Sequence, residues 1–228
     1  VHEPRRTDVG NADFNGILQF TNTANQFGFP TTIFGGQPRI SLDEAQSTLL
    51  NYIRSGFTSS SADTNLLWFG GHGSVDSPGG WRYIQGNRDF WMRSIDQMAG
   101  QLGERVILID HSCGSGNCVR LAPQLHQQGL LQNVAGVIST SDPGQSGVTS
   151  VFEETMQRII SQSAQYDVNS DGSLSFRELQ AAFNAGENQS YDKYGELLGG
   201  KNFHVWAPDM DAPALLNKDD PGLTKNIC

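Results

Sequence analysis

The chain has 228 residues, enough for one large domain or two small ones with a real hydrophobic core. Its hydrophobic content of 37% and charged content of 17% are ordinary for a globular protein. A net charge of −9 argues against nucleic acid as a partner, because phosphate binding needs clustered Lys and Arg. No apolar run approaches the roughly 20 residues that a membrane span needs, so no membrane partner is expected.

The cysteines and the first residue bear on the cellular compartment. Because the chain begins at Val1 rather than Met, we expect that a signal or pro-segment has been removed, with self-processing as one route, or that the chain is trimmed. If Cys113 is a free thiol, Cys118 and Cys228 remain for a disulfide; alternatively, Cys118 is a small buried hydrophobic residue. With a sequon at Asn188-Gln189-Ser190, these features favour an extracellular protein over a cytoplasmic one.

The first third of the chain predicts strands and one helix. Residues 16–20 and 31–34 are apolar and bounded by turn-forming residues, which indicates two strands. A capping box at residues 41–44, followed by apolar residues at helical intervals, predicts a helix that ends near Gly56. The apolar run at residues 66–69 predicts the next strand.

The middle of the chain alternates helices and strands. The apolar spacing of residues 90–102 predicts a helix, and the aliphatic run at residues 106–109 predicts a buried strand. A helix over residues 119–131, with Pro123 in its first turn, and a strand over residues 134–138 follow. This alternation predicts an α/β fold with a mostly parallel sheet covered by helices on both faces.

The next segment predicts a calcium site. Residues 167–178 follow a predicted helix and carry oxygen-bearing side chains at fixed intervals, with Gly172 at the sixth position. The expected Ca²⁺ ligands are Asp167, Asn169, Asp171, Ser173 through its carbonyl, Ser175 through water, and Glu178 with two oxygens. This pattern predicts an EF-hand helix-loop-helix over residues 151–186; the alternative is a solvated acidic turn. Residues 202–206 predict a last strand, and the tail from Ala207 is loop-like.

A cysteine and a histidine follow two of the apolar strands. Cys113 stands in a Gly- and Ser-rich loop after residues 106–109, and His72 stands between two glycines after residues 66–69. Their separation, 113 − 72 = 41 residues, is about one strand-helix-strand crossover. If the two strands are parallel neighbours, both side chains emerge at one sheet edge, where α/β proteins place their chemistry. A histidine base converts a thiol into a nucleophile at neutral pH.

Simpler interpretations exist for both residues. Cys113 could be a buried structural thiol or a disulfide partner of Cys118. A serine nucleophile is disfavoured, because neither Ser112 nor Ser115 has the flanking glycines of a nucleophile elbow. His72 is a poor packing residue, since its glycine neighbours contribute no core.

These residues resemble the caspase, metacaspase and legumain clan of cysteine peptidases. The resemblance lies in an apolar strand with His-Gly, a crossover, and a second apolar strand with an acidic residue shortly before Cys113-Gly114-Ser115-Gly116. This motif is similar to the Cys-x-Ser-Gly of metacaspases and legumains. Residues 138–142 resemble the next strand and substrate-binding loop of that clan, and the likeness covers roughly residues 14–155.

The resemblance implies a single domain over residues 1–228, with a caspase-like, mostly parallel six-stranded sheet between helices and the EF-hand inserted before the last strand. It implies a cysteine endopeptidase that acts on protein or peptide substrates: Cys113 attacks the scissile carbonyl and His72 transfers protons. The N–H groups of Gly73 and Cys113 would stabilise the oxyanion. The alternatives are a non-catalytic, calcium-dependent binding module of this fold and a legumain-like transpeptidase or ligase.

The resemblance also locates a substrate pocket. In the clan, the residue two before the cysteine shapes this pocket; here that residue is His111, with Asp110 one step earlier. The opposite wall is expected to contain Ser139, Ser141 and Asp142. Because the two aspartates attract cations and a neutral His111 can hydrogen-bond an amide, we expect cleavage after Arg, Lys or Asn, and poor cleavage after Asp.

Overall fold

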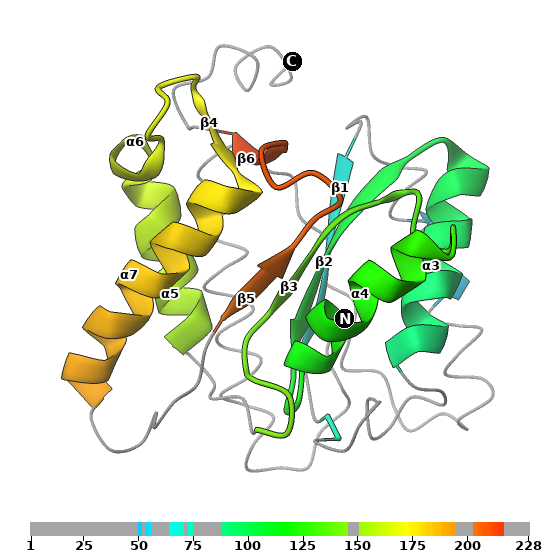
Figure 1. Cartoon of the computed structure of the whole chain (residues 1–228), viewed down its shortest axis with the longest axis horizontal. Helices are drawn as coiled ribbons and strands as arrows, with labels where there is room; N and C mark the ends of the chain where they lie inside the picture. The colour runs from blue at the N-terminus through cyan, green and yellow to red at the C-terminus, as the bar shows by residue number, and fades with distance from the viewer. Residues whose placement is uncertain are drawn as a thin grey trace.

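The computed structural model describes residues 50–51, 53–55, 64–70, 73–74, 88–145, 151–194 and 203–216. These residues form an α/β fold in which a mostly parallel sheet lies between two groups of helices (Figure 1). The predicted fold class is therefore confirmed at this level. The strands predicted at residues 16–20 and 31–34 lie outside the described residues, so the predicted count of six strands in the sheet stays a prediction.

The main sheet contains four described strands in the spatial order β1-β2-β3-β5. The first three strands are parallel, and β5 runs antiparallel to β3. Their bounds are Thr64–Gly70 for β1, Arg105–His111 for β2, Val134–Ser139 for β3 and His204–Trp206 for β5. The strands expected at residues 66–69, 106–109, 134–138 and 202–206 all form, and each parallel connection contains a helix.

Helices cover both faces of this sheet (Figure 1). One face carries α3 (Arg88–Leu102) and α4 (Gly116–Gln127), the two crossover helices. The other face carries α5 (Val151–Ser161) and α7 (Phe176–Tyr194), with the short α6 (Ser163–Tyr166) between them. Among the described residues, the two faces therefore have separate hydrophobic clusters, one on each side of the sheet.

The helix expected over residues 119–131 begins and ends earlier than predicted. Successive turns that start at Ser112 lead straight into α4, so Pro123 lies in its interior instead of its first turn. The helix ends because Gly129 adopts a φ of +74° and its N–H donates to the carbonyl of His126. Leu131 follows the end of the helix and is fully buried.

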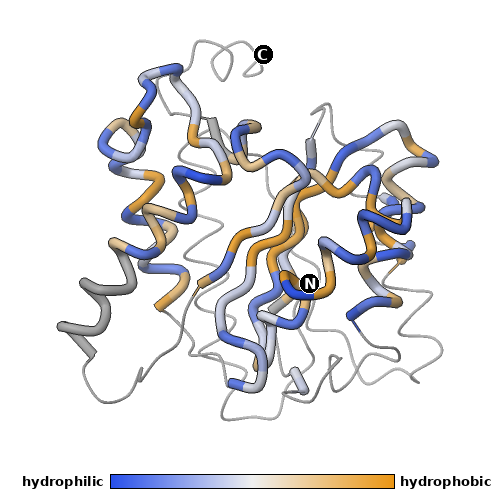
Figure 2. The backbone as a smooth tube through the Cα atoms, in the orientation of Figure 1, coloured by the Kyte–Doolittle hydropathy of each residue, from blue (hydrophilic) through white to orange (hydrophobic). Residues whose placement is uncertain are grey.

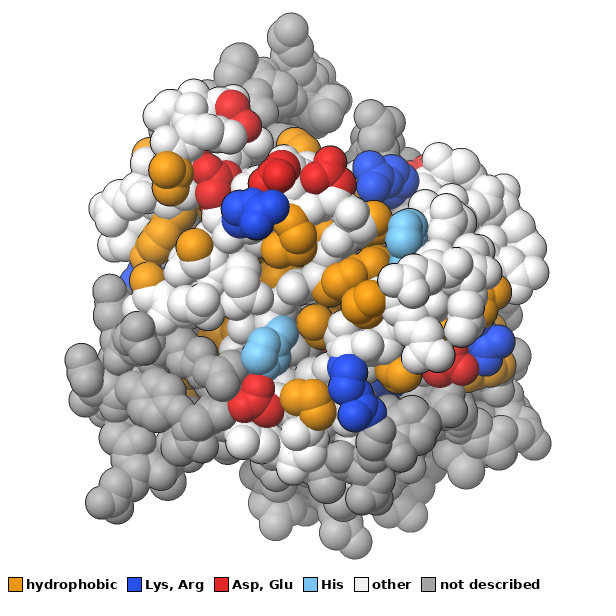
Figure 3. Space-filling model, in the orientation of Figure 1, with side chains coloured by type: hydrophobic (Ala, Val, Ile, Leu, Met, Phe, Trp, Pro, Cys, Tyr) orange, Lys and Arg blue, Asp and Glu red, His pale blue; other side chains and the backbone are white. Residues whose placement is uncertain are grey.

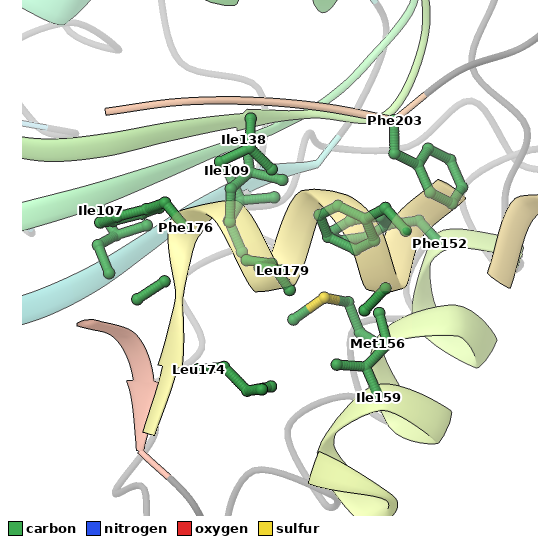
Figure 4. Packing of buried hydrophobic residues seen from close by; sticks show 14 of the residues in the cluster. Ile107, Ile109, Ile138, Phe152, Met156, Ile159, Leu174, Phe176, Leu179 and Phe203 are labelled. Atoms are coloured by element: carbon green, nitrogen blue, oxygen red, sulfur yellow. The ribbon is translucent and has the colours of Figure 1, made fainter. Parts of the chain in front are cut away.

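Strand residues alternate between the two clusters. In β2, Val106 and Leu108 pack against α3 and α4, whereas Ile107 and Ile109 pack against α5 and α7. Figure 2 shows the resulting apolar stretch along the centre of the sheet, and Figure 4 shows the cluster on the α5 and α7 side. The same alternation continues into the polar residues at the end of β2, so Asp110 points toward α3 and His111 toward α5.

The segment from α5 to α7 contains the predicted helix-loop-helix. Between its helices, β4 (Ser173–Ser175) pairs antiparallel with β6 (Pro213–Leu216), and Leu174 lies opposite Leu215. The prediction that the tail from Ala207 is loop-like is therefore wrong for β6. The apolar partner Leu174 is buried in the main cluster, which stabilises a strand that is too short to be predicted from alternation alone.

The viewed surface is mixed in character. Figure 3 shows acidic, basic and apolar side chains interspersed over the described part of this face, with acidic side chains gathered toward its upper edge. None of the helices in the described ranges is long and apolar enough to cross a membrane.

Candidate active site and calcium loop

The carboxyl ends of β1 and β2 meet in register. Gly70 of β1 lies opposite His111 of β2 in the parallel pair. In the sequence, His72 follows Gly70 by two positions, and Cys113 follows His111 by two positions. The strands that carry the proposed dyad are thus parallel neighbours, as the spacing required. His72 itself lies outside the described residues.

Gly73, the residue after His72, packs directly against residues 112–116, which are named the nucleophile loop after the predicted role of Cys113. A methyl group on its Cα would lie 2.2 Å from the carbonyl oxygen of Cys113 and 2.7 Å from Oγ of Ser112. Real Cβ atoms essentially never approach a backbone oxygen this closely. Only glycine therefore fits between the loop that follows β1 and the loop that follows β2.

Cys113 is a half-buried free thiol. Its carbonyl oxygen accepts a hydrogen bond from Arg88, but among the described residues no acceptor is found for its N–H. The N-terminus of α4, with its partial positive charge, begins three residues later at Gly116. A thiol, a backbone donor and a helix N-terminus therefore lie together where negative charge would develop during attack on a carbonyl.

The serine of the Cys113–Gly116 motif is structural. Ser115 is fully buried, and its Oγ accepts the N–H of Thr140 at 3.0 Å and lies 3.0 Å from Oγ of Ser141. The Ser115 N–H donates to the same Ser141 oxygen at 3.1 Å. The two serines therefore join the nucleophile loop to the segment that follows β3.

The two glycines of the motif have different reasons for their identity. Gly114 adopts a φ of +70°, and its N–H donates to the carbonyl of Gln145 at 2.6 Å. A Cβ on Gly116 would lie 2.5 Å from Cδ of Pro143. The motif is thus the junction at which the loops after β2 and β3 pack without room for side chains.

Arg88 and Asp110 form a buried ion pair below this junction. The Nε of Arg88 donates to Oδ2 of Asp110 at 2.6 Å, and Ser112 Oγ donates to the other oxygen. Burial is the largest single influence and would lower the pKa of Arg88, but the charge of Asp110, its hydrogen bond and the two nearby cysteines together outweigh it, so the pKa is raised. Removing either partner would leave a buried charge, at a cost of about 3–5 kcal/mol. Asp110 was expected to face substrate; instead its charge is held internally by Arg88.

Cys118 is a second free thiol behind the nucleophile loop. It is fully buried in α4, and its Sγ donates to Oδ2 of Asp110 at 3.1 Å. Burial, followed by the negative charge of Asp110, raises the pKa of this thiol well above its ordinary value. Cys118 is free in the structure, and Cys228, its possible disulfide partner in the sequence, lies outside the described residues.

His111 points to the opposite face of the sheet. Its ring lies 5.7 Å from that of Trp68 and 5.5 Å from that of Phe152, measured between centroids. Its Nδ1 lies 3.0 Å from Oε1 of Glu153, and among the described residues neither carboxylate oxygen of Glu153 accepts a hydrogen bond. His111 was expected to shape the substrate pocket; it is instead buried against the first turn of α5.

The other predicted pocket residues lie at the end of β3. Ser139 and Ser141 are fully buried, and Ser139 pairs with His204 across the antiparallel ladder. Asp142 is half-buried, and its Oδ1 lies 2.5 Å from Nε2 of His204. Of the predicted pocket residues, Asp142 alone keeps substantial exposure. Its partner His204 lies on β5 and is itself half-buried.

The predicted calcium loop is folded by turns in which side chains accept backbone N–H groups. Asp167 accepts from the N–H groups of Asp171 and Gly172, at 3.2 and 3.0 Å. Asp171 in turn accepts the N–H of Ser173 at 2.9 Å. Gly172 takes a φ of +87°, as the sharp turn at position six requires, and Ser170 takes +59°.

Glu178 closes the loop. Its Oε1 accepts the N–H of Val168 at 2.8 Å, and its Oε2 accepts the N–H of Ser175 at 2.9 Å. Burial raises the pKa of Glu178, but these hydrogen bonds outweigh it and the pKa is lowered. In this conformation the described residues contain no group of three carboxylate, imidazole or thiolate side chains at metal-binding separation. The oxygen-bearing side chains of this loop match the oxygen ligands that Ca²⁺ prefers. To bind the ion, the carboxylates would give up their hydrogen bonds to backbone N–H groups.

Several residues of this region were not predicted from the sequence. Arg88, Glu153 and the pairing role of His204 carry no local motif, because each meets its partner only through the tertiary fold. The sequence offers one weak signal for Arg88, because it stands at the start of α3, the first described helix after His72. Comparisons with protein-family models, with curated proteins and with solved structures give no match.

Proposed function

We propose that this protein is a caspase-like cysteine endopeptidase that binds calcium. The observation that carries the proposal is the contact between Gly73 and Cys113. It joins the residue that follows His72 to the carbonyl of the proposed nucleophile, at the shared end of two parallel strands. The finer features of the caspase-like fold, including a six-stranded sheet, belong to this proposal.

The chemistry follows from the groups at this junction. The Cys113 Sγ attacks the scissile carbonyl carbon, and the carbonyl oxygen acquires negative charge. The N–H groups of Gly73 and Cys113 stabilise that charge, and one such donor contributes about 3 kcal/mol to lowering the barrier. His72 removes the thiol proton or delivers a proton to the leaving amine. Water then hydrolyses the thioester and releases the second product.

The proposed preference for Arg, Lys or Asn before the cut rests chiefly on Asp142. The charge of Asp110 is balanced by Arg88, and His111 is buried beside Glu153. Asp142 keeps partial exposure and a titratable partner in His204. A substrate cation would displace or join this pair, whereas a substrate aspartate would add a second negative charge beside it.

Selective alkylation tests the proposal. Cys113 is half-exposed, whereas Cys118 is buried and its raised pKa keeps it protonated. In the native protein, iodoacetamide should therefore modify Cys113 and spare Cys118, as peptide mass spectrometry can resolve. Hydrolysis of a fluorogenic peptide should be lost in step with Cys113 modification. Full modification of Cys113 with hydrolysis retained would exclude the proposed mechanism.

A further inference from the structure

Arg88 is the most completely enclosed charged side chain near the site. It begins α3 and has no exposed surface. Its guanidinium donates to four acceptors on three segments of the chain. The acceptors are Asp110 Oδ2 at 2.6 Å, the Ser74 carbonyl at 3.1 Å, Ser112 Oγ at 2.9 Å and the Cys113 carbonyl at 2.7 Å.

Two of these acceptors are backbone carbonyls, one on each of the two loops that carry the proposed dyad. The Ser74 carbonyl is two residues after His72, and the Cys113 carbonyl belongs to the proposed nucleophile itself. Gly73 lies between them, and a Cβ on it would lie 2.8 Å from Nη2 of Arg88. One guanidinium thus holds the chain on the carboxyl side of His72 against the backbone of Cys113.

We propose that Arg88 is a positioning residue, which sets the separation and orientation of His72 and Cys113 by clamping their loops together. This inference rests on the proposed function, because it assumes that the two residues act as a dyad. Arg88 is enclosed, so it acts through the backbone of the two loops without touching substrate.

The geometry requires arginine specifically. A planar guanidinium with five N–H donors can reach a carboxylate, a hydroxyl and two carbonyls at once, whereas a lysine ammonium is a single point of charge. Asp110 orients the guanidinium. The Ser112 hydroxyl links the two, because it accepts a hydrogen bond from Arg88 and donates one to Asp110. Arg88→Lys therefore keeps the charge that Asp110 needs but loses the simultaneous contacts to both loops.

The chain supplies a matched control and an internal reporter. Arg93 lies on the same helix and forms an exposed ion pair with Asp89, so Arg93→Lys makes the same chemical change away from the site. Cys118 contacts Asp110 through its Sγ. If a variant opened the core instead of shifting the loops, Cys118 would become reactive to iodoacetamide.

The experiment measures the alkylation rate of Cys113 against pH, together with kcat and KM for a fluorogenic peptide. The proteins compared are the wild type, His72→Ala, Arg88→Lys, Arg93→Lys and the double variant Arg88→Lys/His72→Ala. A misplacement of about 1 Å can cost about 100-fold in rate, so we expect Arg88→Lys to lower kcat by about 10- to 100-fold with KM within about twofold. In Arg88→Lys, the pH dependence of Cys113 alkylation should shift toward that of His72→Ala, and Cys118 should remain unreactive. Arg93→Lys should behave like the wild type.

The double variant decides how Arg88 acts. If Arg88 works by positioning His72, the profile of the double variant should match that of His72→Ala alone. A folded Arg88→Lys protein with wild-type kcat and profile would overturn the positioning role while leaving the dyad intact. Additive effects, or reactive Cys118, would show that Arg88 acts on the fold in general. A wild-type profile that does not change in His72→Ala would overturn the dyad and this inference together.

If Arg88→Lys does not fold, the charge-neutral double variant Arg88→Gln/Asp110→Asn takes its place. It removes both members of the buried pair and so leaves no uncompensated charge. We expect the same loss of kcat and the same shift in the pH dependence of Cys113 alkylation, because the guanidinium that contacts the Ser74 and Cys113 carbonyls is still missing. Wild-type kinetics in this variant would overturn the inference.

Discussion

Gly73 and Cys113 lie in such close contact that any side chain on Gly73 would overlap the carbonyl oxygen of Cys113. The contact joins two loops that are about 40 residues apart in the sequence and that leave the same edge of the sheet. A substitution at Gly73 therefore probes the junction of the proposed dyad without removing either of its side chains.

We expect Gly73→Ala to lower kcat/KM by at least about 100-fold and to destabilise the protein by about 1–3 kcal/mol, because the methyl group must push the two backbones apart. Peptide hydrolysis and urea unfolding measure the two effects. Gly100→Ala is the control: the three atoms nearest to its Cβ belong to the side chain of Asn133, which can shift where a backbone carbonyl cannot, and alanine favours the helix there. Equal activity of both variants would show that the contact is not needed.

The second prediction concerns calcium. Saturation at about 100 times Kd stabilises a protein by about 2.7 kcal/mol, which for a chain of this size raises Tm by roughly 5–10 °C. Glu178→Gln should abolish this rise, because an amide cannot supply two anionic oxygens. Asp211→Asn, which removes an exposed partner of Arg177 outside the loop, should keep it. Calorimetry of protein first freed of metal by a chelator measures both.

Peptide hydrolysis with and without chelator completes this test, and we expect activity to fall as α5 and α7 lose order. If the Tm of the metal-freed wild-type protein did not rise with added calcium, the loop would have no structural ion.

The third prediction concerns the residue before the cut. A fluorogenic library varied only at that position should give cleavage after Arg, Lys or Asn and poor turnover after Asp. Because Asp142 is the partly exposed carboxylate of the proposed pocket, Asp142→Asn should reduce the ratio of Arg to Asn cleavage by roughly five- to tenfold. The control Asp209→Asn removes an exposed carboxylate elsewhere. A wild-type preference for Asp would contradict the proposed pocket.

The fourth prediction follows from the raised pKa of Cys118. The unfolded thiol loses its proton near pH 9, whereas the folded thiol keeps it to higher pH because of burial and Asp110. The folded state then binds more protons, so the free energy of unfolding falls as pH rises above about 9. Cys118→Ala should lower stability at pH 7 and make this decline shallower. Urea unfolding between pH 7 and 10.5 measures it; identical slopes in both proteins would refute it.

Much of the fold could be predicted from the sequence because the core strands are continuous aliphatic runs. Residues 106–109 and 134–138 are buried on both faces, so only a parallel sheet covered by helices accommodates them. The start of α4 could not be predicted, because it depends on hydrogen bonds that the nucleophile loop donates to Gln145 and Ser141. The strand β6 needs β4 as its partner, and that pairing joins segments about 40 residues apart.

A residue of the candidate site could be predicted only where a reactive side chain directly follows a strand that is recognisable in the sequence. Cys113 was identified because a small-residue loop follows a buried strand. Asp110 and His111 were assigned to substrate because their partners are invisible in the sequence. Arg88 reaches Asp110 from the preceding helix α3, and Glu153 reaches His111 from the helix that leads to the predicted calcium loop. Buried charges need partners, but the sequence does not say which residue supplies them.

The most direct test of the central claim is the digestion of a denatured protein, with calcium and with chelator, followed by mass spectrometry of the cut sites. Wild-type protein and Cys118→Ala should cut in calcium after Arg, Lys or Asn, and less in chelator. Cys113→Ala should make no cuts while its circular dichroism remains that of the wild type. Cutting by Cys113→Ala at the wild-type rate would contradict the account.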